Sequence, residues 1–242
     1  MPLKIAMWSG PRNISTAMMR SFENRPDTEV VDEPFYAYYL RQSGSPHPMA
    51  EEILASQSHD YNKVVKQLTE TGGAATIQYQ KHMTHHLGAD EDLSWTVGLI
   101  NCFLIRNPAE VIASYTQSRG VCSAHDIGII RQWQIYQQVH ALTGQALPIV
   151  DANDVLQNPE PILKALCKKI AIPFHANMLA WPPGTRSSDG VWHPHWYASV
   201  KASTGFAPYV AKSVTLDTQQ QHVYAEVKPY YAELYARRIQ GT

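Results

Sequence analysis

The chain has 242 residues, of which 44% are hydrophobic and 17% are charged, and its formal net charge is -1. This composition is typical of a globular protein that buries a substantial core, and we expect one domain over residues 1–242. Because a nearly neutral chain has no overall field that would gather nucleic acid or an anionic membrane surface, any anion site must be built locally.

The hydrophobic pattern predicts strands and helices that alternate along the chain. We expect strands at residues 3–9, 29–32, 74–80, 101–107 and 147–154. We expect helices at residues 14–25, 34–40, 62–71, 124–142, 159–172 and 218–239, and one more that begins at Pro108. Such alternation predicts an α/β fold of three layers, in which helices cover both faces of a mostly parallel central sheet.

The segment from about residue 176 to 215 departs from this pattern. It is rich in Pro, Gly, Ser and Trp, which predicts an irregular cover or an active-site flap. Its aromatic and basic second half could close over a bound nucleotide, with Lys201 and Phe206 as candidate contacts. A small apolar cluster that includes Trp192, Trp196 and Phe206 is the alternative interpretation.

The first strand leads through a Gly-Pro-Arg-Asn turn into a helix with two hydroxyl side chains at its start. Backbone N–H groups at a helix start, hydroxyls and a cation together form a site for phosphate or sulfate. The candidate binding residues are Gly10, Pro11, Arg12, Asn13, Ile14, Ser15 and Thr16. A plain turn with a solvated Arg12 is the alternative. The loop lacks the second Gly and the Lys of the motif G-x-x-x-x-G-K-[ST], which disfavours ATP hydrolysis.

A second group of polar residues follows the predicted strand at 101–107. Arg106 lies at the carboxyl end of this strand, and Pro108 can start the next helix. Ser114 lies about two helical turns beyond Pro108, so Arg106 and Ser114 could bind one phosphate together. A surface ion pair of Arg106 is the alternative interpretation.

The two groups resemble the donor-binding signatures of P-loop sulfotransferases. Residues 11–17 align with P-K-S-G-T-T-W, residues 106–114 align with R-N-P-x-D-x-x-x-S, and residues 149–174 resemble a further stretch of that family. The resemblance implies a P-loop fold and an enzyme that moves the sulfuryl group of 3′-phosphoadenosine 5′-phosphosulfate to a hydroxyl or amine. It also implies that the first loop binds the 5′-phosphosulfate and that Arg106 and Ser114 bind the 3′-phosphate.

The first loop departs from the family pattern at two positions. Arg12 stands where the family has the lysine that contacts the bridging oxygen, and Ile14 stands where it has a glycine. An arginine presents a planar fork rather than a point charge, which changes how the donor is held. Since a sulfuryl group carries less negative charge than a phosphoryl group, protein cations can stabilise it, and we expect no metal.

The acceptor has to lose a proton as it attacks sulfur, so the site needs a base. His82 and His86 follow the third predicted strand, as a catalytic histidine does in cytosolic sulfotransferases. Glu33 precedes Pro34 at the end of the second strand and resembles the glutamate base of carbohydrate sulfotransferases. His82 and His86 also have the spacing of two zinc ligands on a helix, which is the alternative for them.

Other functions stay open at this point. A P-loop phosphotransferase and a non-catalytic nucleotide-binding protein are compatible with the same fold. An aminotransferase finds no support, because no lysine has a recognisable pyridoxal-phosphate setting. The acceptor is expected to be a small molecule or a sugar. The neighbouring aromatic residues Phe35, Tyr36, Tyr38 and Tyr39 suit such a ligand, but they equally suit a buried helix face.

Cysteines and apolar runs bear on the cellular setting. Cys102, Cys122 and Cys167 are widely spaced and odd in number, which argues against a disulfide framework. No apolar run reaches the roughly 18 residues of a membrane span, and the N-terminal segment does not resemble a signal peptide. We expect a cytoplasmic protein with neither membrane nor nucleic-acid partners.

Overall fold

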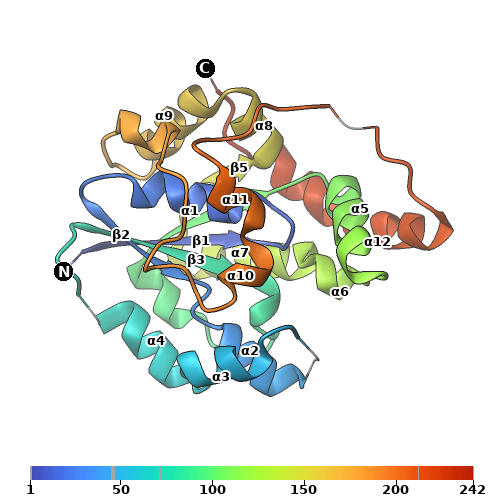
Figure 1. Ribbon diagram of the computed structural model, residues 1–242, viewed down its shortest axis with the longest axis horizontal. Helices are drawn as coiled ribbons and strands as arrows, with labels where there is room; N and C mark the ends of the chain where they lie inside the picture. Colours follow the sequence, from blue (N-terminus) through green and yellow to red (C-terminus); the bar gives the residue numbers. More distant parts are fainter. Residues whose placement is uncertain (1, 45–46, 71, 212, 242) are drawn as a thin grey trace.

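A parallel sheet of five strands forms the centre of the computed structural model, which describes residues 2–44, 47–70, 72–211 and 213–241. The strands are β1 (Leu3–Ser9), β2 (Thr28–Asp32), β3 (Ile77–Met83), β4 (Ile100–Ile105) and β5 (Ile149–Asp151). They lie in the order β2-β3-β1-β4-β5, and all neighbours are parallel. The predicted α/β fold with a mostly parallel sheet is therefore confirmed (Figure 1).

Helices cover both faces of the sheet, as predicted. The α-helices are α1 (Ser15–Glu23), α2 (Tyr36–Ser43), α3 (Ala50–Ser56), α4 (Tyr61–Glu70), α5 (Pro108–Arg119), α6 (Ala124–Ile127), α7 (Ile129–Thr143), α8 (Ala152–Gln157), α9 (Pro159–Lys169), α10 (His193–Trp196), α11 (Ala198–Ala202) and α12 (Thr218–Ala236). Three 3-10 helices, η1 (Thr84–His86), η2 (Ser94–Gly98) and η3 (Ala176–Leu179), complete the described elements. None of the helices among the described residues is long and apolar enough to cross a membrane.

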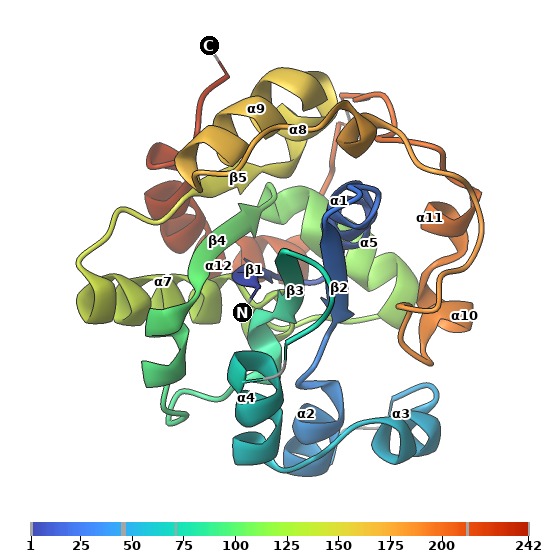
Figure 2. The same cartoon turned by 90° about the vertical axis from the view of Figure 1, so that its left-hand side faces the viewer.

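Two apolar layers hold the helices on the sheet. One contains side chains of α1 and α9, such as Phe22 and Leu163, packed on β1, β3 and β4. The other contains side chains of α4, α7 and α12, such as Leu68, Ile135 and Leu234. Figure 2 shows α7 to the left of the strands, while α2, α3 and α4 lie together below them. Burial of these apolar faces is the main stabilising contribution to such a fold.

The predicted boundaries of the third and fifth strands are wrong. The third strand begins at Ile77 and continues through Met83, so His82 lies within β3. The fifth strand is short because the Asp151 carboxylate accepts hydrogen bonds from backbone N–H groups and caps α8. The predicted helix 62–71 corresponds to α4, and Thr71 lies outside the described residues. The short helix α3 was not predicted.

The predicted helix 124–142 is divided into α6 and α7 at Gly128, whose φ is 72°. A Cβ at Gly128 would lie 2.9 Å from Thr84 Oγ1 and 3.5 Å from the Gly10 Cα. A Cβ at Gly10 would lie 2.6 Å from the Ile127 carbonyl oxygen. Both positions therefore require glycine, because the first loop packs directly against the junction between the two helices.

The segment 176–215 covers one end of the sheet and contains η3, α10 and α11 (Figure 1). Ion pairs and hydrogen bonds attach it to α1: Asp189 accepts from Arg20 at 2.5 Å, and Asn24 donates to the Ala180 carbonyl at 2.6 Å. Ala180 and Gly205 form an antiparallel bridge within the cover. These contacts hold the part of the segment from Ala180 to Asp189 against α1, and Lys212, which falls in the segment, lies outside the described residues.

Candidate active site

A cavity of about 660 Å³ lies at the carboxyl ends of β1, β2 and β3, between α5 and the cover. Residues of the first loop, of α5 and of α10 and α11 line it. The carboxyl edge of a parallel sheet is where α/β proteins of this kind bind ligands, because loops and helix starts converge there. The cavity contains the chemistry-bearing residues described below.

The two motifs predicted from the sequence meet in this cavity. The Arg12 Nε donates a hydrogen bond to the Ser114 Oγ at 3.0 Å, although the two residues are 102 positions apart. The Asn13 side chain donates to the Leu104 carbonyl at 3.0 Å and accepts from the Ile14 N–H at 2.8 Å. These bonds fix the loop between β1 and β4 and direct Arg12 toward α5.

Arg12 has a strained backbone, with a φ of 53°. A non-glycine residue at positive φ costs free energy, and such residues cluster at functional sites. Partial burial of the guanidinium, together with the positive charges of Arg106 and Arg119, lowers the pKa of Arg12 below its usual value. Three arginines therefore gather around one cavity, where an anion would be stabilised.

Arg106 is held by the residue that stands at the acidic position of its motif. Its Nε and one terminal nitrogen donate to the Glu110 carboxylate at 2.9 and 2.8 Å, and its other terminal nitrogen donates to the Arg12 carbonyl at 3.0 Å. The second Glu110 oxygen accepts from Asn153 at 2.8 Å. A guanidinium has five N–H groups, so Arg106 keeps two for a ligand. Arg106 therefore forms the ion pair that was the alternative interpretation, and it still has N–H groups available for a ligand.

Lys81 forms a buried network at the end of β3. Its ammonium group donates to Asp32 at 2.9 Å, to Glu33 at 2.6 Å and to the Tyr197 hydroxyl at 2.7 Å. The Tyr197 hydroxyl also donates to an Asp32 oxygen at 2.7 Å, and the Trp192 indole N–H donates to that hydroxyl at 3.1 Å. The network joins the cover to the sheet and fixes the Glu33 carboxylate at the cavity wall.

The protonation of this network follows from burial and charge. Burial alone lowers the pKa of Lys81, but the Asp32 and Glu33 carboxylates outweigh it and hold that pKa well above its usual range. Burial raises the pKa of Glu33, and the Lys81 charge only partly offsets this effect. Lys81 is therefore a fixed cation, while Glu33 is poised to take up a proton more readily than an exposed glutamate.

The two candidate histidines lie on opposite sides of β3. His86 lines the cavity, where its Nε2 is 3.9 Å from a Glu33 carboxylate oxygen and its ring stacks on Tyr36 at 4.7 Å. His82 is buried outside the cavity lining, stacks on Trp8 at 4.4 Å and contacts Gln80 at 3.1 Å. Alternate side chains of a strand face opposite sides, so Lys81 and His82 cannot both reach the cavity.

Some of the remaining candidate residues line the cavity and others do not. The loop residues from Pro11 to Thr16 line the cavity. Gly10 does not line it and instead packs against the junction between α6 and α7. Lys201 and Phe206 do not line it, and Phe206 packs edge-on against Trp181 at 5.2 Å. Among the described residues there is no group of three His, Cys, Asp or Glu side chains that could hold a metal.

Several residues of the cavity wall were not predicted. Arg119 lies one helical turn after Tyr115 on α5, so helical spacing from Ser114 and Tyr115 could have placed it there. His47 comes from the loop before α3 and carries no local signal. Tyr197 was part of the predicted cover, but only the folded chain brings its hydroxyl to Asp32.

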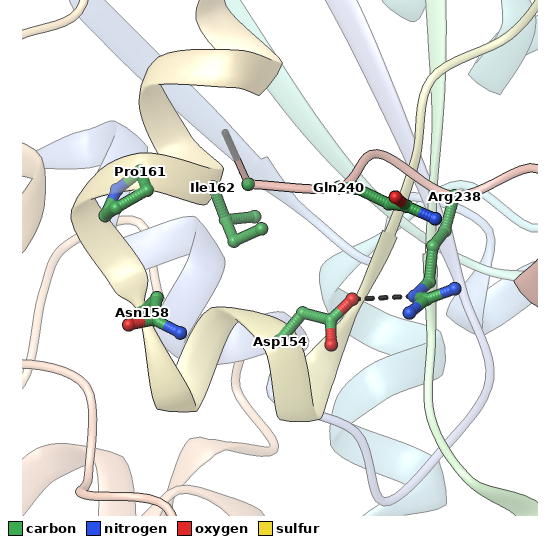
Figure 3. A pocket seen from close by; sticks show the side chains of 7 residues that line it. Asp154, Asn158, Pro161, Ile162, Arg238 and Gln240 are labelled. Atoms are coloured by element: carbon green, nitrogen blue, oxygen red, sulfur yellow. Dashed lines mark hydrogen bonds and ion pairs between the residues drawn. The ribbon is translucent and has the colours of Figure 1, made fainter.

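A second cavity of about 520 Å³ lies between α8, α9 and the C-terminal residues (Figure 3). Its lining includes Asp154, Asn158 and Arg238, and the Arg238 Nε donates to the Asp154 carboxylate at 2.7 Å. None of the residues predicted to bind the donor or to act in catalysis lines this cavity.

Residues 3–238 match a family model described as a sulfotransferase domain. Two proteins of Arabidopsis thaliana, named branched-chain-amino-acid aminotransferase-like proteins 1 and 2, are 37% and 36% identical over 208 and 205 residues. The matches cover 85% and 84% of this chain but only 37% and 36% of the plant proteins, so the chain spans about a third of these relatives.

Solved structures share the fold at low sequence identity. A sulfotransferase from Alicyclobacillus acidocaldarius has a TM-score of 0.56 at 10% identity and covers 99% of this chain and 98% of its own. A sulfotransferase domain of the Synechococcus PCC 7002 olefin synthase has a TM-score of 0.55 at 15% identity, with 94% and 95% covered. A sulfotransferase domain from the curacin biosynthetic pathway has a TM-score of 0.50 at 15% identity, with 94% and 98% covered.

Proposed function

The chain belongs to the sulfotransferase domain family, and on this basis we propose that it transfers a sulfuryl group from 3′-phosphoadenosine 5′-phosphosulfate to a hydroxyl or amine of a small acceptor. The observation that carries the proposal is the 3.0 Å hydrogen bond between Arg12 and Ser114. It joins the loop expected to bind the 5′-phosphosulfate to the helix expected to bind the 3′-phosphate. A single donor molecule could therefore span both groups within one cavity.

The donor would lie along the first loop, where N–H groups at the start of α1 and the hydroxyls of Ser15 and Thr16 are available. Arg106 would bind the 3′-phosphate through its two remaining N–H groups, and Ser114 would contribute its hydroxyl. Arg12 lies between these positions, so its guanidinium would stabilise the charge that develops on the bridging oxygen.

In the transfer step, the acceptor oxygen or nitrogen forms a bond to sulfur while the bond from sulfur to the bridging oxygen breaks. The leaving group is adenosine 3′,5′-bisphosphate, and the acceptor proton passes to a base. Glu33 is the proposed base, because it lines the cavity and burial raises its pKa. His86 is the alternative base, since it also faces the cavity. His82 is not retained, because it lies outside the cavity lining.

The names of the two plant relatives refer to proteins of which this chain spans about a third. Aminotransferase chemistry is not proposed for this chain, because a lysine that forms a Schiff base needs a lowered pKa. The lysine of this cavity, Lys81, is instead held as a cation by two carboxylates.

The proposal predicts that adenosine 3′,5′-bisphosphate raises the apparent melting temperature without added metal, because a ligand that binds only the native state stabilises it. Thermal unfolding with this nucleotide, with 5′-AMP and with ATP plus magnesium provides the measurement. We expect the bisphosphate to stabilise the protein more than either other nucleotide. Equal stabilisation by 5′-AMP would contradict a 3′-phosphate site, and a preference for ATP with magnesium would favour a phosphotransferase.

A further inference from the structure

We infer that the part of the cavity around Arg119 binds an anionic group of the acceptor, with the Arg119 guanidinium and the Tyr36 hydroxyl as hydrogen-bond donors. The chemical class that fits is a small hydroxy-carboxylate. This assignment rests on the proposed function, because it concerns the acceptor side of the same cavity.

The position of Arg119 separates it from the donor motifs. Helix α5 begins next to Arg106 and ends at Arg119, which lies five residues, about 7.5 Å of helix rise, beyond Ser114. The side chains that surround Arg119 come from other elements: His47 before α3, Trp196 in α10 and, through His47, Tyr36 in α2. Tyr36 follows the proposed base Glu33 by three residues, so this group lies on the acceptor side of the reaction.

The hydrogen bonds of His47 fix the direction of the donors. A terminal N–H of Arg119 donates to His47 Nε2 at 3.0 Å, because a guanidinium cannot accept. Burial, with the charges of Arg119 and His195, lowers the pKa of His47 to about 4, so the ring is neutral at pH 7. Its proton must then lie on Nδ1, which donates to the Tyr36 hydroxyl oxygen at 2.7 Å. The Tyr36 hydroxyl proton is therefore directed away from His47.

Tyr36 is an effective donor for a ligand. Its side chain is buried and lines the cavity. Burial and the nearby Glu33 raise the pKa of Tyr36, so its hydroxyl keeps its proton. A hydroxyl whose oxygen already accepts one hydrogen bond and whose proton is still available favours an acceptor atom on the ligand.

Arg119 carries a charge that the described part of the chain does not neutralise. No carboxylate of the described residues lies within ion-pairing distance of it, whereas Arg106 is paired with Glu110 and Lys81 with Asp32 and Glu33. The guanidinium is held on the Trp196 ring at 4.7 Å, which leaves most of its N–H groups unused. Its planar fork matches a carboxylate in two parallel hydrogen bonds.

The walls next to this fork suit an organic ligand. Tyr36, Tyr115 and Trp196 line the cavity together with Arg119. Aromatic walls with a few polar groups that fix orientation are typical of small-molecule sites. A hydroxy-carboxylate would place its carboxylate on Arg119 and Tyr36, and its hydroxyl toward Glu33 and the donor loop.

The test uses two probes of equal shape and different charge, 4-hydroxybenzoate and 4-hydroxybenzamide. Each is titrated calorimetrically into the protein saturated with adenosine 3′,5′-bisphosphate. We expect the benzoate to bind at least about tenfold more tightly than the benzamide, the scale of one hydrogen bond between charged groups. Arg119→Gln should reduce this ratio to about one, and Tyr36→Phe should reduce it in part.

Matched variants separate recognition from a general charge effect or a structural role. Arg41→Gln removes an exposed arginine at the end of α2 and should leave the ratio unchanged. Arg119→Lys keeps the charge but not the fork, and should retain a part of the preference if Arg119→Gln fails to fold. Because each variant is compared with itself on two probes, a mere loss of stability does not change the ratio.

The outcomes also separate this inference from the proposed function. If the unaltered protein does not bind the nucleotide in the absence of both probes, the proposed function itself is wrong. Normal nucleotide binding with equal affinity for both probes, or with binding of neither, would overturn only the acceptor assignment. A tenfold loss of nucleotide affinity in Arg119→Gln with an unchanged probe ratio would reassign Arg119 to the donor, which also overturns it.

Discussion

Arg12 occupies the position where the family signature has a lysine. The direction of its side chain follows from its backbone conformation. The positive φ of this residue turns the side chain toward α5, where Ser114 accepts its hydrogen bond. A fork can hold Ser114 with one N–H and still present others to the donor. The substitution of lysine by arginine is therefore compatible with a role at the bridging oxygen.

We predict that Arg12→Ala lowers the transfer rate by roughly 100-fold, as the loss of one preorganised transition-state donor does, with a smaller effect on the affinity for adenosine 3′,5′-bisphosphate. The rate is measured with labelled donor and the best acceptor from a screen of phenols, amines and sugars. Arg12→Lys, which restores the family residue, serves as the conservative control. Equal losses of rate and nucleotide affinity would assign Arg12 to ground-state binding alone.

Glu33 sets the expected pH dependence of transfer. Burial raises its pKa above the usual value of 4.5, and a base acts only when it is deprotonated. Activity should therefore fall as the pH falls through this raised pKa. Glu33→Gln should remove that acidic limb from the pH–rate profile and lower the rate by about 100-fold or more.

His86→Gln is the matched variant for this experiment, because His86 faces the same cavity. It should keep the acidic limb if Glu33 is the base. A limb that persists in Glu33→Gln and disappears in His86→Gln would transfer the role to the histidine.

At the scale of elements, the first loop depends on the break between α6 and α7. Gly128 has a positive φ, and a Cβ there would approach both Thr84 and Gly10 closely. The loop and the helix junction therefore form one packed unit, so a change at the junction should alter the conformation of the first loop. Residues far from the loop in sequence thus position it.

We predict that Gly128→Ala lowers the unfolding free energy by about 1–3 kcal/mol and also weakens binding of adenosine 3′,5′-bisphosphate. Gly144→Ala is the matched control, because Gly144 has a φ of 66° at the end of α7 but no atom within 4 Å of an added Cβ. It should share the backbone strain and leave nucleotide affinity unchanged. Urea unfolding and calorimetric titration measure the two effects. Equal nucleotide affinity in both variants would show that the helix junction does not affect nucleotide binding, which contradicts the prediction.

At the scale of the whole molecule, several buried histidines make stability depend on pH. Burial lowers the pKa of His82 to about 3, and that of His85 to about 3, and it holds the pKa of His86 well below its usual range. Between these values and about 6.5, the unfolded chain binds protons that the folded chain does not. Stability from these histidines is therefore lost as the pH falls below about 6.5.

We predict that His82→Gln reduces the loss of unfolding free energy between pH 5.5 and 4 by up to about 1.4 kcal/mol per pH unit, the effect of one proton. His82 is suited to this test because it is 1% exposed and lies outside the cavity. Urea unfolding followed by circular dichroism at several pH values gives the slope. His222→Gln, an exposed change on α12, controls for the loss of a histidine elsewhere. An unchanged slope in His82→Gln would show that folding does not lower the pKa of His82, because the folded and unfolded chains would then bind this proton equally.

The fold class and the two motifs that meet in the cavity could be predicted from the amino-acid sequence. Apolar runs at residues 3–9 and 101–107 have the length and composition of buried strands, and local periodicity is sufficient to identify such elements. Arg12 and Ser114 were identified because each belongs to a short contiguous motif. Two expectations stay predictions: one domain over residues 1–242, and a cytoplasmic location.

Which side chains share the cavity follows from the folded chain and not from local sequence. Some contacts of the folded chain join residues far apart in the sequence: Lys81 pairs with Asp32 and Tyr197, and Arg119 contacts His47. The same folding excludes His82 from the cavity lining. Local patterns cannot specify such contacts, because strand register and loop paths are set by packing of the whole chain. The extension of β3 through Met83 illustrates the reason, because it directs Lys81 toward the cavity and His82 away from it.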